Sequence, residues 1–162
     1  MAGVVDALGQ DLTPPRPVLG PLPRPGQRLA QGVARLLASM DYAALTEVTP
    51  RPGLRVDLMA LGPRGEIWVI ECKSSRVDFV SDRKWQGYLD WCDRFFWAVP
   101  VDFPREILPD GAGVILADDW GGEILSMPDT SPLASARRRA LTLRFARMAA
   151  FRQQAPGAVL SD

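Results

Sequence analysis

The sequence predicts an α/β domain in which helices flank a mixed β-sheet. Three observations lead to this prediction. An amphipathic helical segment precedes three apolar runs of strand type, a second helical segment separates these from a fourth run, and 162 residues with 47% hydrophobic content suffice for one sizeable core. We expect one domain, residues 26–155, between a disordered proline-rich tail, residues 1–25, and a C-terminal tail, residues 156–162.

The first half of the domain is expected to hold one helix and a three-stranded meander. The helix spans residues 28–40, where apolar residues recur at helical spacing: Leu29, Val33, Leu36, Leu37 and Met40. Strands are expected over residues 42–49, 54–61 and 67–73, with the first ending at a proline and a Pro-Gly turn joining the other two.

The second half is expected to alternate helix and strand. A helix is predicted over residues 78–92, with an inner face of Phe79, Trp85, Leu89 and Cys92. The remaining elements are strands and one long helix, at residues 93–99, 113–117, 123–127 and 132–154. This order suits an α/β sandwich with a mixed sheet.

Composition excludes several classes of protein. The net charge is zero, so nucleic-acid binding must come from a local patch. The chain has no histidine, which excludes histidine catalysis and histidine metal ligands. Cys72 and Cys92 are too few for a zinc framework or a disulfide scaffold and are expected as inert buried thiols. The sequence shows neither a secretory signal nor a membrane-spanning run, which predicts a cytoplasmic protein with no membrane partner.

The third strand carries the most informative residues. Side chains alternate along a strand, so Glu71 and Lys73 point to the same face. Charges are rare in a buried strand unless they are paired or functional. The chain has 17 arginines but only two lysines, so Lys73 suits a task that arginine performs poorly, such as that of a compact donor with a tunable pKa.

The turn that joins the second and third strands brings Asp57 to this face. A turn centred near Arg64 places Asp57 opposite Glu71, Arg55 opposite Lys73 and Met59 opposite Val69. Opposed side chains lie about 5 Å apart at Cβ, and two carboxylates that close repel each other unless a cation separates them. Mg²⁺ or Mn²⁺, hard divalent ions that prefer oxygen ligands, would suit this site, and the nearby lysine would orient or deprotonate a metal-bound water. The alternative is a salt-bridge cluster of these charged residues on a solvated face.

The motif resembles the signature of the PD-(D/E)XK nuclease superfamily. The residues that carry the resemblance are Arg55-Val56-Asp57 and, after a spacer, Val69-Ile70-Glu71-Cys72-Lys73. With the helix that follows, Asp82-Arg83-Lys84-Trp85-Gln86-Gly87-Tyr88, residues 26–154 more closely resemble the MmcB family of bacterial DNA-repair proteins. The resemblance implies a restriction-endonuclease-like core.

The resemblance also implies roles for individual residues. Asp57 and Glu71 would ligate the metal, the backbone carbonyl of Cys72 would add a ligand, and Lys73 would position the attacking water. Val56 stands where the superfamily motif has proline. Many members have an acidic residue on the first helix, where this chain offers only Gln27 and Gln31.

Candidate DNA contacts lie on two later helices. Lys84 and Gln86 fall on a helix that the superfamily often uses near its active site, and their alternative is a solvated helix surface. The final helix carries six arginines and no acid, and Arg144 and Arg147 flank its apolar stripe. These arginines have two possible roles: they contact DNA, or they offset the negative charge of the acidic stretch 102–129. Among the tryptophans, Trp120 is the best candidate for exposure and base stacking.

Three functions fit the sequence. The first is a DNA-repair protein with a metal-dependent nuclease-type site, a deoxyribonuclease that hydrolyses DNA phosphodiesters with Mg²⁺ or Mn²⁺. The second is a catalytically inactive module of the same fold that binds DNA or a repair partner. The third is an interaction domain whose proline-rich residues 13–25 dock into a partner groove.

Overall fold

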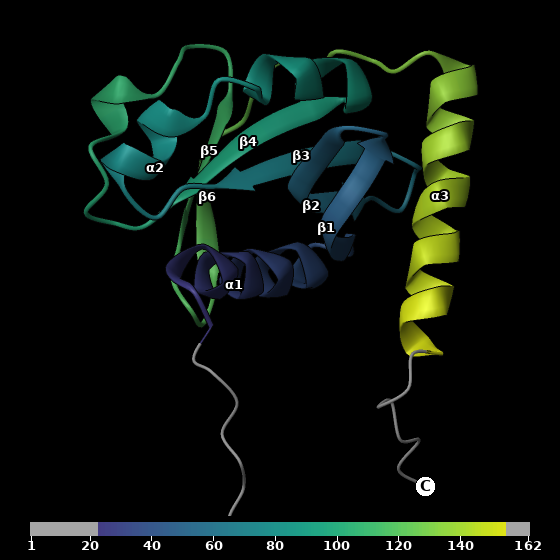
Figure 1. Ribbon diagram of the computed structural model, residues 1–162, viewed down its shortest axis with the longest axis horizontal. Coiled ribbons are helices and arrows are strands. Elements are labelled where there is room, and N and C mark those ends of the chain that lie inside the picture. The colour runs from purple at the N-terminus through teal and green to yellow at the C-terminus, as the bar shows by residue number, and fades with distance from the viewer. Residues whose placement is uncertain (1–22, 155–162) are drawn as a thin grey trace, which may run out of the picture.

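The computed structural model describes residues 23–154 and confirms an α/β fold with a six-stranded mixed sheet. The strands lie in sequence order, β1 to β6. β1 with β2, β2 with β3 and β5 with β6 are antiparallel, whereas β4 runs parallel to both β3 and β5. The helix, three-strand, helix, strand order is consistent with a restriction-endonuclease-like core. Figure 1 shows α1 and α3 on different sides of the sheet.

The strands and the first and last helices lie close to their expected positions. The helices are α1 (Pro25–Ser39), α2 (Arg76–Ser81) and α3 (Ser135–Gln153), with 3-10 helices η1 (Trp85–Trp91) and η2 (Arg105–Ile107). The strands are β1 (Ala43–Arg51), β2 (Leu54–Leu61), β3 (Ile67–Cys72), β4 (Arg94–Val99), β5 (Gly113–Ala117) and β6 (Gly122–Ser126). The expected tails lie largely outside the described residues, as does the part of segment 13–25 that precedes residue 23.

α1 covers one face of the sheet. It begins with Pro25, whose fixed φ suits the first helical position, and the Gln27 side chain accepts the backbone N–H of Arg24 at 2.9 Å. Leu29, Val33 and Leu37 are buried against the central strands. The helix also meets the β5–β6 turn so closely that a Cβ atom added to Gly32 would lie 1.9 Å from the Asp118 carbonyl oxygen.

Replacing Gly32 with alanine is therefore expected to lower the free energy of unfolding by about 1–3 kcal/mol or more, because two backbone segments must separate. Urea unfolding followed by circular dichroism would measure it. Gly26→Ala is the matched control on the same helix, because a Cβ atom there meets nothing within 4 Å. Equal stability of the two variants would show that the turn is not fixed against α1.

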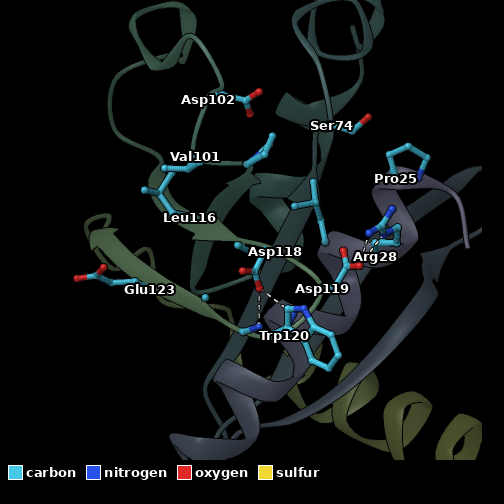
Figure 2. Close-up of a pocket in the computed structure, with 15 residues that line it drawn as sticks. Pro25, Arg28, Ser74, Val101, Asp102, Leu116, Asp118, Asp119, Trp120 and Glu123 are labelled. Atoms are coloured by element: carbon cyan, nitrogen blue, oxygen red, sulfur yellow. Dashed lines mark hydrogen bonds and ion pairs between the residues drawn. The ribbon is translucent and has the colours of Figure 1, made fainter.

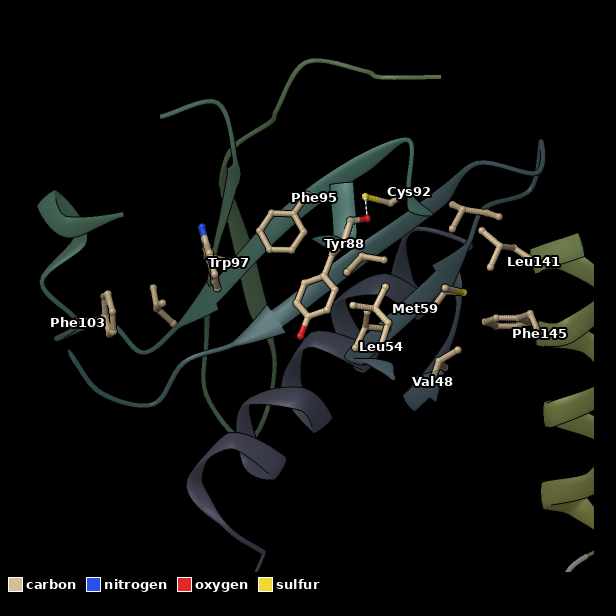
Figure 3. Packing of buried hydrophobic residues seen from close by; sticks show 14 residues of the cluster. Val48, Leu54, Met59, Tyr88, Cys92, Phe95, Trp97, Phe103, Leu141 and Phe145 are labelled. Carbon is tan, nitrogen blue, oxygen red and sulfur yellow. Dashed lines mark hydrogen bonds between the residues drawn. The ribbon is translucent and has the colours of Figure 1, made fainter. Parts of the chain in front are cut away.

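The other face is covered by η1 and α3. Tyr88 from η1 and Leu141 and Phe145 from α3 belong to one buried cluster with Met59 and Trp97 of the sheet, and Figure 3 shows the α3 residues on the Met59 side of it. α3 is fixed by the ion pair between Arg138 and Asp93, with Nη1 to Oδ2 at 2.6 Å. Asp93 also accepts the backbone N–H groups of Ile67 and Leu133. Burial alone would raise the pKa of Asp93, but the hydrogen bond from Arg138 and these two backbone donors hold it below its usual range.

The expected helix over residues 78–92 was wrong, since the structure divides this segment into α2 and η1. The break lies at Asp82, whose Oδ1 accepts the Lys84 backbone N–H at 2.8 Å and so competes with the helical hydrogen bonds. The division also turns Leu89 outward, with 43% of its surface exposed, against its expected inner position. The first strand continues through Pro50, which had been expected to end it.

The longest helix, α3, carries exposed arginines along its length. Between residues 23 and 154, no helix combines the length and the apolar character needed to cross a bilayer.

Candidate metal and nucleic-acid site

The register between β2 and β3 is the one that the sequence predicts. Met59 pairs with Val69 and Leu58 with Ile70, so the next position along places Asp57 opposite Glu71. The two acids exchange hydrogen bonds with each other's strand. The Asp57 backbone N–H donates to Glu71 Oε1 at 3.0 Å, and the Cys72 backbone N–H donates to Asp57 Oδ2 at 2.8 Å. Each carboxylate is thereby held in place and keeps one oxygen for another partner.

The strand is distorted at Asp57, which the alternation of side chains did not predict. Val56 and Leu58 would share a face in a regular strand, yet Val56 packs in the core cluster beneath α3 and Leu58 in the cluster beneath α1. On β1, Glu47 stands opposite Asp57 and has a φ of 53°. This paired irregularity turns the Asp57 carboxylate toward the end of β3.

Glu71 and Lys73 are buried, with 3% and 7% of their surfaces exposed. Lys73 Nζ lies 3.8 Å from Glu71 Oε2. Arg55, expected opposite Lys73, instead pairs with Glu47 at 3.0 Å on the exposed side of β1 and β2. The alternative of one solvated salt-bridge cluster is therefore wrong: the central pair lies inside the protein and Arg55 is not part of it.

The main partner of Lys73 is Asp82, a residue that the sequence analysis did not assign to the site. Nζ donates to Asp82 Oδ2 at 2.6 Å. Burial alone would lower the pKa of Lys73, but the hydrogen bond and the charge of Asp82, with Glu71 behind it, raise the pKa above its usual value. Lys73 is thus a charged donor. It can orient a water or stabilise negative charge, but the structure does not favour it as the base that deprotonates water.

Burial and neighbouring carboxylates raise the pKa values of the two acids, although Lys73 lies nearby. Burial, together with the nearby Asp57 carboxylate, raises the pKa of Glu71 to about 8. Burial also raises the pKa of Asp57. A divalent cation between the two carboxylates would act in the opposite direction, because it favours the ionised form of both groups.

The donor set fits a hard divalent ion held by few protein ligands. Among residues 23–154, no three His, Cys, Asp or Glu side chains converge as a metal site. Asp57 and Glu71 offer carboxylate oxygens, to which the Cys72 backbone carbonyl can add a third donor. Mg²⁺ and Mn²⁺ suit such a set, since Mg²⁺ keeps several waters and is often bound through one or two carboxylates. The Cys72 side chain is not a ligand, because it packs beneath α1 and burial raises its pKa well above the usual value.

A groove of about 750 Å³ gives access to Asp57 and Lys73. Gln27 and Gln31 of α1 line it, so the first helix presents amides where many members of the superfamily have an acid. Glu47 also lines the groove. It lies on β1, on the other side of Asp57 from Glu71.

Ser75 caps the start of α2, and Ser74, which precedes it, is held by an acid of the same helix. Ser75 Oγ accepts the Asp78 backbone N–H at 3.2 Å, and Asp78 Oδ2 accepts the Ser74 backbone N–H at 3.1 Å. Lys84 and Gln86 are exposed, and Lys84 is joined through its backbone to the Asp82 carboxylate that holds Lys73. Neither residue lines the groove, and only Lys84 is connected to the site, through its backbone.

The arginines of α3 lie farther from the groove. Arg144 donates to the Thr49 carbonyl oxygen at 2.8 Å, and Arg147 lies 5.4 Å from the Phe151 ring. Neither residue lines the groove. Arg152 comes closer, because it donates to the Thr46 carbonyl oxygen at 2.6 Å and Thr46 does line it.

Within the described residues, no ion pair joins an α3 arginine to an acid of the stretch 102–129. In residues 23–154, the carboxylate partner of an α3 arginine is Asp93, outside that stretch. Arg137, Arg144 and Arg152 donate to backbone carbonyls, which leaves their positive charges uncompensated. Their charge remains available to a nucleic-acid backbone.

The sequence missed Asp82 because its role depends on a tertiary contact. It lies nine positions after Lys73, beyond a helix, and nothing in its local pattern distinguishes it from a helix-capping residue. One local feature could have indicated it. An aspartate within an expected helix can accept the backbone N–H two residues later, as Asp82 does from Lys84, and so end the helix.

Comparisons with known proteins identify the family of the chain. A family model described as DNA repair protein MmcB-like matches residues 22–157. A solved structure, described as the SPO1766 protein of unknown function from Silicibacter pomeroyi, is 52% identical with a TM-score of 0.82 and covers 88% of this chain and 100% of that chain. None of the curated proteins matches the chain. The family model spans the whole described domain with the Asp57, Glu71 and Lys73 site in it, and the chain thus belongs to the MmcB-like family of DNA-repair proteins.

Proposed function

We propose that this DNA-repair protein hydrolyses DNA phosphodiesters at a metal-dependent nuclease-type site formed by Asp57, Glu71 and Lys73. The observation that carries the proposal is the burial of a carboxylate and an ammonium 3.8 Å apart, beside a second carboxylate that opens to a groove. Placing such charges in a sheet is costly unless they perform a task. The resemblance to the PD-(D/E)XK superfamily supports the same function.

Each residue has a distinct role in this proposal. Asp57 and Glu71 hold Mg²⁺ or Mn²⁺ with the Cys72 carbonyl, and the ion, when bound, activates water and offsets phosphate charge. Lys73 stays protonated, orients the water and stabilises the charge that develops on the phosphate. Asp82 fixes Lys73 in position. Lys84 and Gln86 contact the DNA near the site, and Arg144 and Arg147 contact its backbone from α3.

The test is a cleavage assay on duplex, single-stranded and branched DNA with Mg²⁺ and with Mn²⁺. Asp57→Asn keeps an acceptor for the Cys72 N–H but loses the charge, so cleavage is expected to fall about a hundredfold or more. Asp102→Asn, an exposed change outside the groove, is the matched control and should leave the rate unchanged. Equal rates for the parent and Asp57→Asn would reject the proposed site.

A second function is favoured by the sparse donor set. Amides occupy α1 where the superfamily often has an acid, and backbone N–H groups already engage one oxygen of Asp57 and of Glu71. Both features suit a catalytically inactive module that binds DNA or a repair partner. DNA binding without cleavage in any sample of the same assay would select this function.

A further inference from the structure

A second cavity, of about 740 Å³, lies where the parallel strands β3, β4 and β5 end. Its walls are mostly apolar, with Leu29 of α1, Val101 after β4 and Leu116 of β5 among them. It adjoins the groove of the candidate site, and the two share Pro25 and Ser74. In open α/β sheets, ligands favour the region beyond the carboxyl ends of the strands. The proposed nuclease function uses nothing in this cavity.

An exposed aromatic ring forms one end of the cavity. Trp120 has 80% of its surface exposed, although it belongs to a tight turn between β5 and β6. Figure 2 shows its indole at one end of the cavity and Asp102 at the other. The ring continues the apolar surface formed by Leu29, Val101 and Leu116, and contiguous exposed apolar surface of this kind marks interaction sites.

The turn that carries Trp120 is held in place from several directions. Asp118 Oδ1 accepts the backbone N–H groups of Trp120 and Gly121, at 2.7 and 2.9 Å. Arg28 Nε donates to Asp119 Oδ2 at 2.7 Å, and Arg35 donates to the Asp119 carbonyl. Trp120 is thus presented by a fixed turn, and a ligand would not have to order it.

The charge around the cavity identifies the kind of ligand. Among its lining residues, four carboxylates face one guanidinium: Asp102, Asp118, Asp119 and Glu123 against Arg28. Arg28 is engaged by Asp119, which leaves the remaining acids without that cation. Such a rim repels a phosphate backbone and attracts a cation, and the face of an indole binds guanidinium or ammonium groups well. Arg35 lies outside the lining, with its guanidinium carbon 6.0 Å from the centre of the Trp120 ring, so a ligand's cation would use the opposite face of the indole.

We propose that this cavity binds a protein partner through a segment that places an arginine or lysine on Trp120 and apolar side chains against Leu116 and Val101. Nucleic acid would approach the groove of the candidate site from the side of α3, where Arg152 donates to the Thr46 carbonyl, while the protein partner occupies the acidic cavity. The partner's segment would lie next to the groove, because the two cavities share Pro25 and Ser74. This inference does not depend on catalysis, so it can be tested independently of the proposed function.

The test is a titration of the ¹⁵N-labelled full chain with an acetylated hexapeptide of alternating arginine and leucine, followed by NMR. The expected result is a shift of the Trp120 indole signal and of the amides at residues 117–122. Trp120→Ala is expected to weaken binding about tenfold. Asp102→Asn combined with Glu123→Gln should weaken it as well, and both sets of variants are on the surface and should fold.

Two controls decide the chemistry. A peptide with citrulline in place of arginine has the same shape without the charge and should not bind. Phe151→Ala removes an exposed aromatic residue on α3 and should leave binding unchanged. The proposal is overturned if Trp120→Ala does not weaken peptide binding, if the citrulline peptide binds equally, or if oligothymidylate and not the peptide shifts the Trp120 signal.

Discussion

Replacing Lys73 with methionine is expected to destabilise the protein by about 3–5 kcal/mol, because removing one partner leaves buried charge without compensation. The lysine contacts Asp82 Oδ2 at 2.6 Å and lies 3.8 Å from Glu71 Oε2. Methionine fills a similar volume, so the loss of stability would come from the missing charge and not from a cavity. Urea unfolding at pH 7.5 would measure the difference.

The role of Asp82 makes this prediction sharper. If Asp82 is the main partner of Lys73, Asp82→Asn in the Lys73→Met background should recover part of the lost stability, since the carboxylate that has lost its cation is also removed. Lys84→Met is the control, because Lys84 is exposed and its loss should change stability by less than about 0.5 kcal/mol. Lys73→Met as stable as the parent would show that the buried contact contributes nothing.

Replacing Glu71 with glutamine is expected to raise stability at alkaline pH by on the order of 2–4 kcal/mol, since one pKa unit corresponds to about 1.4 kcal/mol. The pKa of Glu71 rises from 4.5 to about 8 in the folded protein, mainly through burial and next through Asp57. Between these values the folded state keeps a proton that the unfolded state has released. Stability of the parent therefore falls as pH rises through this window, whereas the glutamine variant has no such charge to bury.

The neighbouring groups do not reverse this sign. The raised pKa of Asp57 acts in the same direction. Asp82, with its pKa lowered below 3.8, and Lys73, with its pKa raised above 10.5, keep one charge state in both folded and unfolded chains from pH 5 to 8.5. Urea unfolding at pH 5 and pH 8.5 should show the parent and Glu71→Gln nearly equal at the lower pH and separated at the higher.

The same variant tests the metal. Mn²⁺ is expected to raise the melting temperature of the parent and not that of Glu71→Gln. The affinity should increase about tenfold per pH unit up to about pH 8, because the ion must displace the Glu71 proton. Glu106→Gln, an exposed acid elsewhere, should respond like the parent. An equal Mn²⁺ response in Glu71→Gln would exclude Glu71 as a ligand.

The sequence by itself determined the architecture and the pairing of the site. Hydrophobic periodicity and turn residues are local, and they placed β2 and β5 at their observed bounds and set the β2–β3 register that brings Asp57 opposite Glu71. The alternation of side chains likewise put Glu71 and Lys73 inside one sheet, with the Cys72 thiol in the opposite core cluster. These features follow from chain geometry over a few residues.

Only the tertiary structure decided the electrostatics and the surfaces. Asp82 meets Lys73 because a short helix ends above the sheet, and Arg55 leaves the site because the paired strands are distorted at Glu47 and Asp57. Trp120 becomes a fixed, exposed ring because α1, ninety residues earlier, holds its turn through Arg28 and Arg35. Burial and long-range contacts fix the charge state of a side chain, and neither can be read from its immediate neighbours in the chain.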